Sequence, residues 1–318
     1  MKTNKMAPGF KRPMVILLSA LSLLAACKKD SDSPADTDKA LTMYSIRETE
    51  VSPNNYTNEL VAIDPATAAI TTLLNLTEQP NSFNMGSLIY LPATNEVAGI
   101  DWNGYKLVKI NVATKQTAIL PLPLGANQEY EGLKLDKAGN LYTVGNRRNG
   151  LDATWEITKI DIATGNTTPM ATFKKSLIGF TYIPATNEIV GTSGTILQKY
   201  NLTTRDTSSV IIAATGNPNY LGLTVDNNSN LYGFKEFSGA TNNSQIVKLN
   251  AATGAETVLT TLNEEEPIYD LLFMPKTNEF LSIWDDTSLY RYNLGTNTST
   301  LTALTTDSKV SFYDLISN

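Results

Sequence analysis

The fold is decided by a short stretch that reads TKIDIATGNT and covers residues 158–167. Apolar and polar residues alternate up to Asp161, a polar turn follows, and a threonine-containing segment leaves it after Gly165. The Asp161 side chain can accept backbone N–H groups two and three residues further on, and glycine tolerates a positive φ. The stretch therefore predicts two antiparallel strands joined by an Asx-type turn.

Five related turns occur elsewhere in the chain, so this hairpin is a repeat. The six turns begin at Asp64, Asn111, Asp161, Asn201, Asn250 and Asn293. Successive copies are 40 to 50 residues apart, which is the length of one four-stranded blade of a β-propeller. The predicted fold class is therefore an all-β propeller.

The units alternate between two kinds of turn joining their first two strands. In three units the turn reads Pro-x-Thr-Asn-Glu, at residues 92–96, 184–188 and 275–279. In two others an Asp-rich turn precedes Asn-Leu-Tyr, at residues 136–142 and 226–232. Proline ends a strand because it cannot donate to the ladder, and the aromatic residue favours the next strand. These turns predict five complete blades.

The first blade is predicted to be completed by the other end of the chain. Residues 41–46 match a second strand, with no first strand before them, and residues 311–316 copy residues 267–272, which start the last complete unit. A C-terminal strand in the N-terminal blade would close a ring of six blades, each of four antiparallel strands, over residues 41–318. An open solenoid is the alternative, and it would leave the first blade without its inner strand.

The N-terminus has the features of a bacterial lipoprotein. Four basic residues precede an apolar run at residues 14–26, which is too short to span a bilayer and is typical of a secretory signal. The run meets Leu-Ala-Ala-Cys, which resembles a lipobox, the motif in which the cysteine, here Cys27, is lipidated. Residues 1–26 are predicted to be a signal peptide and residues 27–40 the lipidated Cys27 and a flexible tether. The alternative for Cys27 is a buried free thiol.

The residue after the cysteine favours the outer membrane. Many lipoproteins retained in the inner membrane have aspartate there, whereas this chain has Lys28. The predicted product is an outer-membrane lipoprotein that faces either the periplasm or the cell surface.

Composition argues against several classes of function. Cleavage after residue 26 removes four of the 25 basic residues and none of the 31 acidic ones, which leaves a net charge of −10. That charge argues against a nucleic-acid partner and against adhesion to anionic headgroups, so the expected membrane contact is the lipid anchor. The chain has no histidine, which removes the commonest general base, the usual serine and cysteine triads, and imidazole metal sites.

Residues 41–318 resemble secreted bacterial six-bladed propellers of the NHL, YncE and TolB types. The likeness rests on the Leu-Tyr pairs and the Asp-x-x-Thr-Gly turns, and it is nearest to uncharacterised extracytoplasmic families. The resemblance implies the six-bladed fold, but motifs of this kind specify blades and not activities.

Carboxylates are expected at the mouth of the central channel. Aligning the starts of the inner strands places one residue of each blade there: Ser87, Glu131, Gly179, Leu221, Asp270 and Asp314. The three carboxylates could hold Ca²⁺ or Mg²⁺ through hard oxygen ligands. Gluconolactonase and regucalcin propellers place acidic and Asn ligands at a comparable axial position, although this chain does not match them residue by residue. The alternative is that these carboxylates are solvated or cap backbone amides.

The connections between the second and third strands of each blade, here called B–C connections, differ in length. They are long at residues 47–58, 146–154 and 235–244, and short at residues 101–105, 192–195 and 284–288. The long ones predict raised loops on the face that holds the channel mouth, or insertions that are merely tolerated.

Aromatic and polar residues near this face are candidates for ligand binding. Trp102 and Trp284 are placed at equivalent points after the second strand of their blades. An indole ring can stack on the C–H face of a sugar whose hydroxyls bind polar neighbours, while packing between blades is the alternative. An arginine pair could bind a carboxylate or phosphate, or be solvated. The candidate residues are Trp102, Asp101, Asn103, Tyr130, Arg147, Arg148, Trp155, Trp284 and Asp285.

Three functions are open from the sequence. The favoured hypothesis is a non-catalytic cell-envelope lipoprotein whose propeller face binds a protein or glycan partner. The second is a divalent-metal-dependent hydrolase or lactonase, in which Glu131, Asp270 and Asp314 hold a metal that lowers the pKa of a bound water. The third is an architectural subunit of an envelope complex. No cofactor is firmly predicted, and Ca²⁺ or Mg²⁺ is the candidate.

Overall fold

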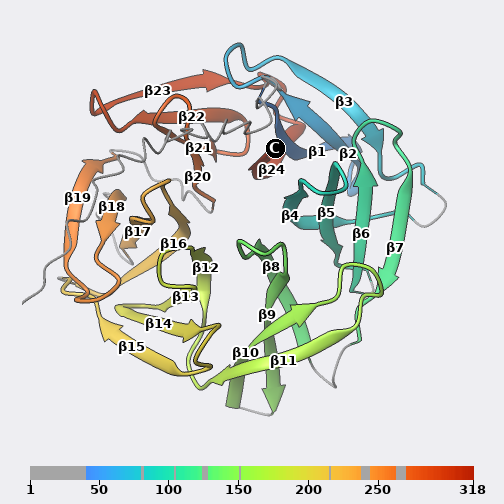
Figure 1. Ribbon diagram of the computed structural model, residues 1–318. Helices are drawn as coiled ribbons and strands as arrows, with labels where there is room; N and C mark the ends of the chain where they lie inside the picture. The colour runs from blue at the N-terminus through green and yellow to red at the C-terminus, as the bar shows by residue number, and fades with distance from the viewer. Residues whose placement is uncertain are drawn as a thin grey trace, which may run out of the picture. The chain divides into compact units, whose positions relative to one another are not determined.

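The computed structural model describes residues 41–79, 82–103, 105–123, 128–149, 152–214, 216–237, 244–262 and 270–318. Leu41–Asn318 forms one compact unit. Its described residues make 24 strands in six four-stranded antiparallel sheets arranged as a ring, and they contain no helix (Figure 1). The predicted six-bladed, all-β propeller is confirmed. The predicted signal peptide, Cys27 and the tether lie outside the described residues.

Each blade is a meander whose inner strand lines the centre of the ring. From the inner to the outer strand, the first three blades are β24 (Val310–Ser317), β1 (Met43–Ser52), β2 (Asn55–Ile63) and β3 (Ile70–Asn75); β4 (Met85–Leu91), β5 (Glu96–Asp101), β6 (Lys106–Asn111) and β7 (Thr117–Pro121); and β8 (Gln128–Leu135), β9 (Leu141–Asn149), β10 (Asp152–Ile160) and β11 (Thr167–Phe173). The next three are β12 (Ile178–Ile183), β13 (Glu188–Ser193), β14 (Ile196–Asn201) and β15 (Thr207–Ile211); β16 (Pro218–Val225), β17 (Leu231–Phe237), β18 (Gln245–Leu249) and β19 (Glu256–Thr261); and β20 (Leu272–Met274), β21 (Glu279–Trp284), β22 (Ser288–Asn293) and β23 (Thr298–Ala303).

The six repeated turns join the third and fourth strands of the blades, and all six have the predicted Asx geometry. In the copy at Asp161, Oδ1 accepts the N–H groups of Ala163 at 2.8 Å and Thr164 at 3.2 Å. The other five turns make the same pair of contacts. The fifth residue of every turn has a positive φ: Ala68, Lys115, Gly165, Arg205, Gly254 and Asn297.

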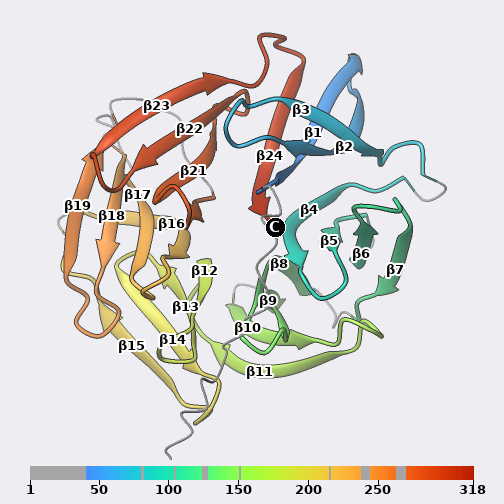
Figure 2. The same cartoon turned by 45° about the horizontal axis from the view of Figure 1, so that its top comes forward.

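The ring is closed by the C-terminal strand, as predicted. β24 pairs antiparallel with β1 from Met43 opposite Ser317 to Thr49 opposite Val310, and Figure 2 shows the two strands side by side. Beyond the strands, the N–H of Asn318 donates to the carbonyl of Thr42 at 3.2 Å, and the N–H of Thr42 donates to Asn318 Oδ1 at 2.9 Å. The open-solenoid alternative is wrong.

The hydrophobic core is divided among the interfaces between blades. Among the described residues there are six clusters of buried side chains, and each bridges two neighbouring blades. Between blades 1 and 2, for example, the rings of Tyr44 and Tyr90 stack with centroids 5.9 Å apart and planes 13° apart. Because burial of apolar surface is the main stabilising term, each blade depends on both of its neighbours.

The long B–C connections of blades 1 and 3 are β-hairpins and not the loops that the sequence suggested. β1 pairs with β2 up to Ser52 opposite Asn55, and β9 pairs with β10 up to Asn149 opposite Asp152. In blade 5, residues 238–243 lie outside the described residues. The long B–C connection of blade 1 is thus a continuation of β1 and β2 as a paired hairpin.

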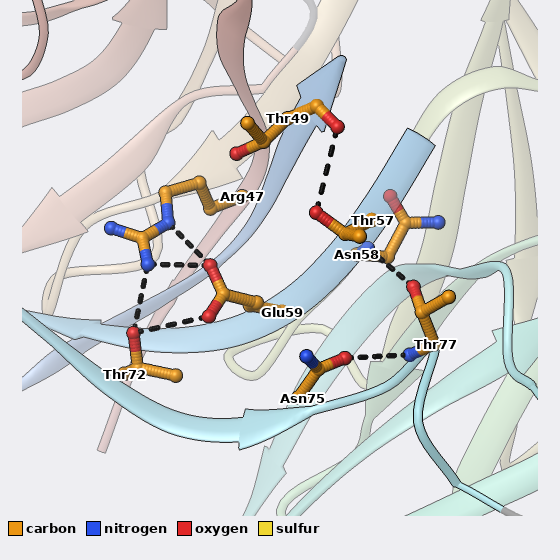
Figure 3. A network of polar contacts seen from close by, with 8 residues as sticks. All are labelled: Arg47, Thr49, Thr57, Asn58, Glu59, Thr72, Asn75 and Thr77. Atoms are coloured by element: carbon orange, nitrogen blue, oxygen red, sulfur yellow. Dashed lines mark hydrogen bonds and ion pairs between the residues drawn. The ribbon is translucent and has the colours of Figure 1, made fainter. Parts of the chain in front are cut away.

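A polar network fixes the base of the blade 1 hairpin. Arg47 of β1 donates from Nε to Glu59 Oε2 of β2 at 2.7 Å and from a terminal nitrogen to Thr72 Oγ1 of β3 at 2.8 Å. Figure 3 shows the guanidinium between these two side chains. On the other edge of β1, the N–H of Glu50 donates to the carbonyl of Lys309 at 2.8 Å. The hairpin is therefore held from both sides.

No helix in the described part of the chain is both long and apolar enough to cross a membrane.

Candidate binding site at the central cavity

A cavity of about 360 Å³ lies between the inner strands of the blades. Its lining is apolar along much of its length, with Leu88, Ile178 and Leu223 among the contributors. Its polar and charged lining residues are Ser87, Glu131, Lys134, Thr224, Asp270, Asp314 and Ser317, with the phenol Tyr90. The volume is near the lower end of the about 300–1,000 Å³ found for small-molecule sites.

The inner strands bulge at the level of these polar residues. Register shifts interrupt the pairing of the inner strand with its neighbour in blades 1 to 5. One residue in each bulge has a positive φ: Ser87, Gly132, Gly179, Gly222 and Asp314. In blades 3 and 5 the equivalent residue is therefore one position after the Glu131 and Leu221 that the sequence alignment used, so that alignment was wrong there.

A chain of hydrogen bonds links three neighbouring blades at the bulges. The N–H of Ser87 donates to Asp314 Oδ2 at 2.8 Å, which joins blade 2 to blade 1. The Ser87 hydroxyl oxygen accepts the N–H of Gly132 at 2.9 Å, which joins blade 2 to blade 3. The sequence argument treated Ser87 only as a non-acidic channel position and missed this role. A bulged strand leaves backbone groups unpaired in the ladder, and these side chains satisfy them.

Asp270 and Asp314 meet at the seam between blades 6 and 1. Burial, followed by the charge of Asp270, raises the pKa of Asp314 to about 8, and a hydrogen bond that the protonated Asp314 carboxyl donates to the Asp270 side chain adds to the rise. The Ser87 N–H and the charge of Lys134 act in the opposite direction. Two carboxyl groups joined by a hydrogen bond cannot readily both ionise, so the pair shares one proton near neutral pH.

This proton gives a testable pH dependence of stability. Between an ordinary carboxyl pKa of about 4 and the raised value, the folded state keeps a proton that the unfolded chain has released. The contribution of Asp314 to stability is therefore fully present at low pH and is lost as the pH rises toward about 8. Asp314→Asn should make the fall in unfolding free energy from pH 5 to pH 8 smaller by about 1–3 kcal/mol. Urea unfolding of both proteins at pH 5 and pH 8 measures this difference. An equal change in unfolding free energy with pH in the two proteins would contradict the shared proton.

The third predicted carboxylate does not join the pair. Glu131 lines the cavity from blade 3. Burial is the main cause that raises the pKa of Tyr105, and the charges of Glu129 and Glu131 add to the rise. Within the described residues, no group of three or more acidic or cysteine side chains lies close enough together to hold a metal ion. The structure thus brings together two of the three residues proposed for Ca²⁺ or Mg²⁺.

Small hydroxyl residues in the second strands hydrogen-bond to the backbone at or next to the acidic positions. The sequence did not lead us to expect these contacts. The Ser45 hydroxyl donates to the carbonyl of Tyr313 at 3.0 Å. In the same way, Thr143 donates to the carbonyl of Glu131 at 3.4 Å, and Ser282 donates to the carbonyl of Asp270 at 2.5 Å. The sequence feature that could have indicated this support is a small residue at the same position in the second strand of every blade. These residues are Ser45, Gly99, Thr143, Gly191, Gly233 and Ser282. The three hydroxyl residues occur in blades 1, 3 and 6, which are the blades with a carboxylate at the channel.

Trp102 lies next to Asp314, which is one of the residues that line the cavity. A Cβ atom on Gly86 would be 2.6 Å from Trp102 Nε1 and 3.1 Å from Asp314 Oδ2, so the indole and the carboxylate both approach this glycine. The indole is 36% exposed, and the Tyr105 ring meets it edge-on with centroids 6.2 Å apart. Glycine is needed at this point because a side chain would displace the indole.

Asp101 organises the loop that carries Trp102. Its side chain is fully buried, and Oδ1 accepts the N–H groups of Asn84 at 3.0 Å and Asn103 at 3.2 Å. Oδ2 lies 3.7 Å from Lys106 Nζ. Asp101 therefore positions the loop, whereas Asn103 itself is exposed beside Trp102.

Trp284 is not equivalent to Trp102, which corrects the sequence alignment. Trp284 is the last residue of β21 and corresponds to Asp101, the last residue of β5. Its side chain is 5% exposed and packs in the cluster between blades 5 and 6, as the packing alternative expected. Asp285, which follows it, is exposed and has a positive φ of 48°. The structure therefore places Trp284 in the core between blades 5 and 6.

The other candidates of blade 3 are not gathered at the cavity. Tyr130 is buried and its hydroxyl donates to the carbonyl of Pro123 at 2.9 Å, while Trp155 packs against the cluster between blades 3 and 4. Arg147 is exposed and donates to Gln128 Oε1 at 3.5 Å. The side chain of Arg148 lies outside the described part of the chain.

Solved structures share this fold at low sequence identity. TolB from Acinetobacter baumannii is 12% identical with a TM-score of 0.64, over 87% of this chain and 66% of that one. A chain of the Nidogen/Laminin complex is 14% identical with a TM-score of 0.61, over 86% of this chain and 97% of that one. Oligogalacturonate lyase in complex with manganese is 13% identical with a TM-score of 0.54, over 77% and 72%.

These likenesses show the fold alone. The chain spans 66% of the length of the TolB structure. No protein-family model and no curated protein sequence matches the chain. Because 970 solved chains match the fold, and propellers have many functions, the function has to be argued from the cavity and its rim.

Proposed function

We propose that the protein is a non-catalytic cell-envelope lipoprotein that binds a partner with the face surrounding the cavity mouth. The observation that carries the proposal is that Trp102, which is 36% exposed, lies beside Asp314, which lines a cavity of about 360 Å³. A concave site with an aromatic side chain and a few converging polar groups is typical of binding sites. The blade 1 hairpin and the loop that carries Trp102 are both B–C connections, so they lie on the same face of the propeller.

The proposed location follows from the sequence. The signal-like residues 1–26 and Cys27 support a lipid anchor in the outer membrane. The resemblance in fold to a TolB structure is consistent with an extracytoplasmic propeller. A protein or a glycan could occupy the face.

A metal-dependent hydrolase has less support than a binding protein. That hypothesis used three carboxylates, and the described structure pairs only Asp270 with Asp314. The Ca²⁺ or Mg²⁺ hypothesis therefore rests on two ligands, one of which shares a proton with the other.

Photocrosslinking in living cells tests the proposed function. A photoreactive amino acid would replace Tyr56, which is 46% exposed at the tip of the blade 1 hairpin, or Asn103 beside Trp102. The matched control position is Ile211, which is 75% exposed on an outer strand of blade 4. Adducts are expected from the two face positions and not from the control. Absence of face adducts, or equal adducts from all three positions, would contradict a binding face.

A further inference from the structure

We infer that the cavity mouth binds the end of a neutral saccharide, stacked on Trp102 and hydrogen-bonded by the Asp270–Asp314 pair. This inference rests on the proposed function and names the ligand class of the same site. It is carried by three features of the mouth, which are the aromatic surface, the hydrogen-bonding capacity and the size of the cavity.

The aromatic surface is partly exposed. Trp102 is held edge-on by Tyr105 at 87° and lies over the backbone of Gly86, yet 36% of it remains exposed. An exposed indole beside polar groups offers an apolar surface together with nearby hydrogen-bonding partners. A sugar ring has a C–H face that can stack on the apolar indole and hydroxyl groups that can bind the neighbouring polar groups.

The carboxyl pair suits hydroxyl groups. Two carboxyls that share one proton present both a donor and several acceptors, and a hydroxyl group both donates and accepts. The charged groups that act on Asp314 are Asp270 and, with opposite sign, Lys134 of β8. Glu48 and Asp286 lie further along the same seam, where Glu48 and Asp314 both act on Tyr313. The shared proton and Lys134 offset part of the negative charge of Asp270, Asp314 and Glu131 in the cavity lining, and the negative charge that is left disfavours an anionic ligand.

The cavity limits how much of a saccharide can enter. At about 360 Å³ it is near the lower end of small-molecule pockets, and its lining includes the apolar residues Leu133, Leu223 and Ile316. Because of this small volume, Asp314, Asp270 and the neighbouring Trp102 would contact one end residue, while the rest of the glycan extends over the face.

Binding of simple glycosides to the full chain tests the inference. The probes are the methyl glycosides of glucose, galactose, mannose and N-acetylglucosamine, and the detergent must have no sugar headgroup. Saturation-transfer NMR should show at least one probe bound with a millimolar Kd, with transfer to its ring C–H protons. Trp102→Ala should weaken this binding about tenfold or more, and Trp102→Phe, which keeps an aromatic face, should retain most of it. Ile211→Ala is the control and should bind as the unmodified protein does.

A second variant tests the hydrogen-bonding pair. Asp314→Asn should weaken glycoside binding about tenfold, because it removes the shared proton and one acceptor. If this variant does not fold, the two Trp102 variants still decide the question, because Trp102 is a partly exposed loop residue.

The outcomes separate the two proposals. No signal from any of the four glycosides, or equal binding by Trp102→Ala and the unmodified protein, overturns the saccharide inference. If crosslinks still form at Tyr56 and Asn103 in that case, the binding face stands and its ligand is of another class. If neither glycosides nor crosslinks are found, both proposals fail.

Discussion

A chain that ends at Asp307 is expected to lose its cooperative unfolding transition, because blade 1 would lack its inner strand. β24 contributes Phe312 and Leu315, both buried in the cluster between blades 6 and 1. Removing a buried phenylalanine or leucine costs about 2–5 kcal/mol each, and the lost pairing with β1 adds to that. The total approaches the about 5–15 kcal/mol by which domains are stable. Thermal melting followed by far- and near-UV circular dichroism measures the loss.

Moving the strand gives a matched control for this truncation. Asn318 and Thr42 are joined by two hydrogen bonds, so residues 310–318 can be placed between Ala40 and Leu41 with a two-residue Asn-Gly turn. This rearranged chain, which also ends at Asp307, should regain a cooperative transition. Cooperative melting of the truncated chain at the original temperature would show that β24 is not required for ring closure.

The strand order could be predicted from the sequence because the signals are local or repeated. An Asx turn needs only one side chain and two amides within three residues, so each of the six copies could be recognised without knowing its surroundings. Ring closure could be predicted because residues 311–316 repeat a segment that starts a complete blade. The same repeat placed Asp270 and Asp314 at equivalent positions, and closure makes their blades neighbours.

The rim could not be predicted as well, because it depends on single-residue register. Side chains alternate between the faces of a strand, so a shift of one residue reverses the side on which a residue lies. Trp102 and Trp284 were aligned although Trp284 corresponds to Asp101, and this one-residue difference separates a rim residue from a core residue. Likewise, the bulge in blade 3 places Gly132, and not Glu131, at the positive-φ position.

The long hairpins were mistaken for loops for a compositional reason. Residues 47–58 include charged residues, asparagines and Pro53, which are typical of loops. In the structure, Pro53 and Asn54 form the tight turn while the flanking residues pair. The contact of Arg47 with Glu59 and Thr72 stabilises these strands, and it joins residues of three strands, which a local reading does not detect.

Gly254→Ala is expected to destabilise the protein strongly, because a side chain there would meet the backbone of the neighbouring blade. Gly254 is the fifth residue of the turn in blade 5, with φ at 73°, and its added Cβ would lie 2.0 Å from the carbonyl oxygen of Ile211 in blade 4. The same glycine accepts the N–H of Ala213 at 3.0 Å, so the blades cannot separate without losing this bond. A positive φ and overpacking together predict a loss of about 2–4 kcal/mol.

The repeat provides the control for this substitution. Arg205 occupies the same turn position in blade 4, with φ at 65° and an exposed side chain, and non-glycine residues also occupy it at Ala68, Lys115 and Asn297. Arg205→Ala should therefore change the unfolding free energy by less than about 0.5 kcal/mol. Urea unfolding of both variants measures the difference. If Gly254→Ala is as stable as Arg205→Ala, neither the positive φ nor the approach of Gly254 to Ile211 limits stability.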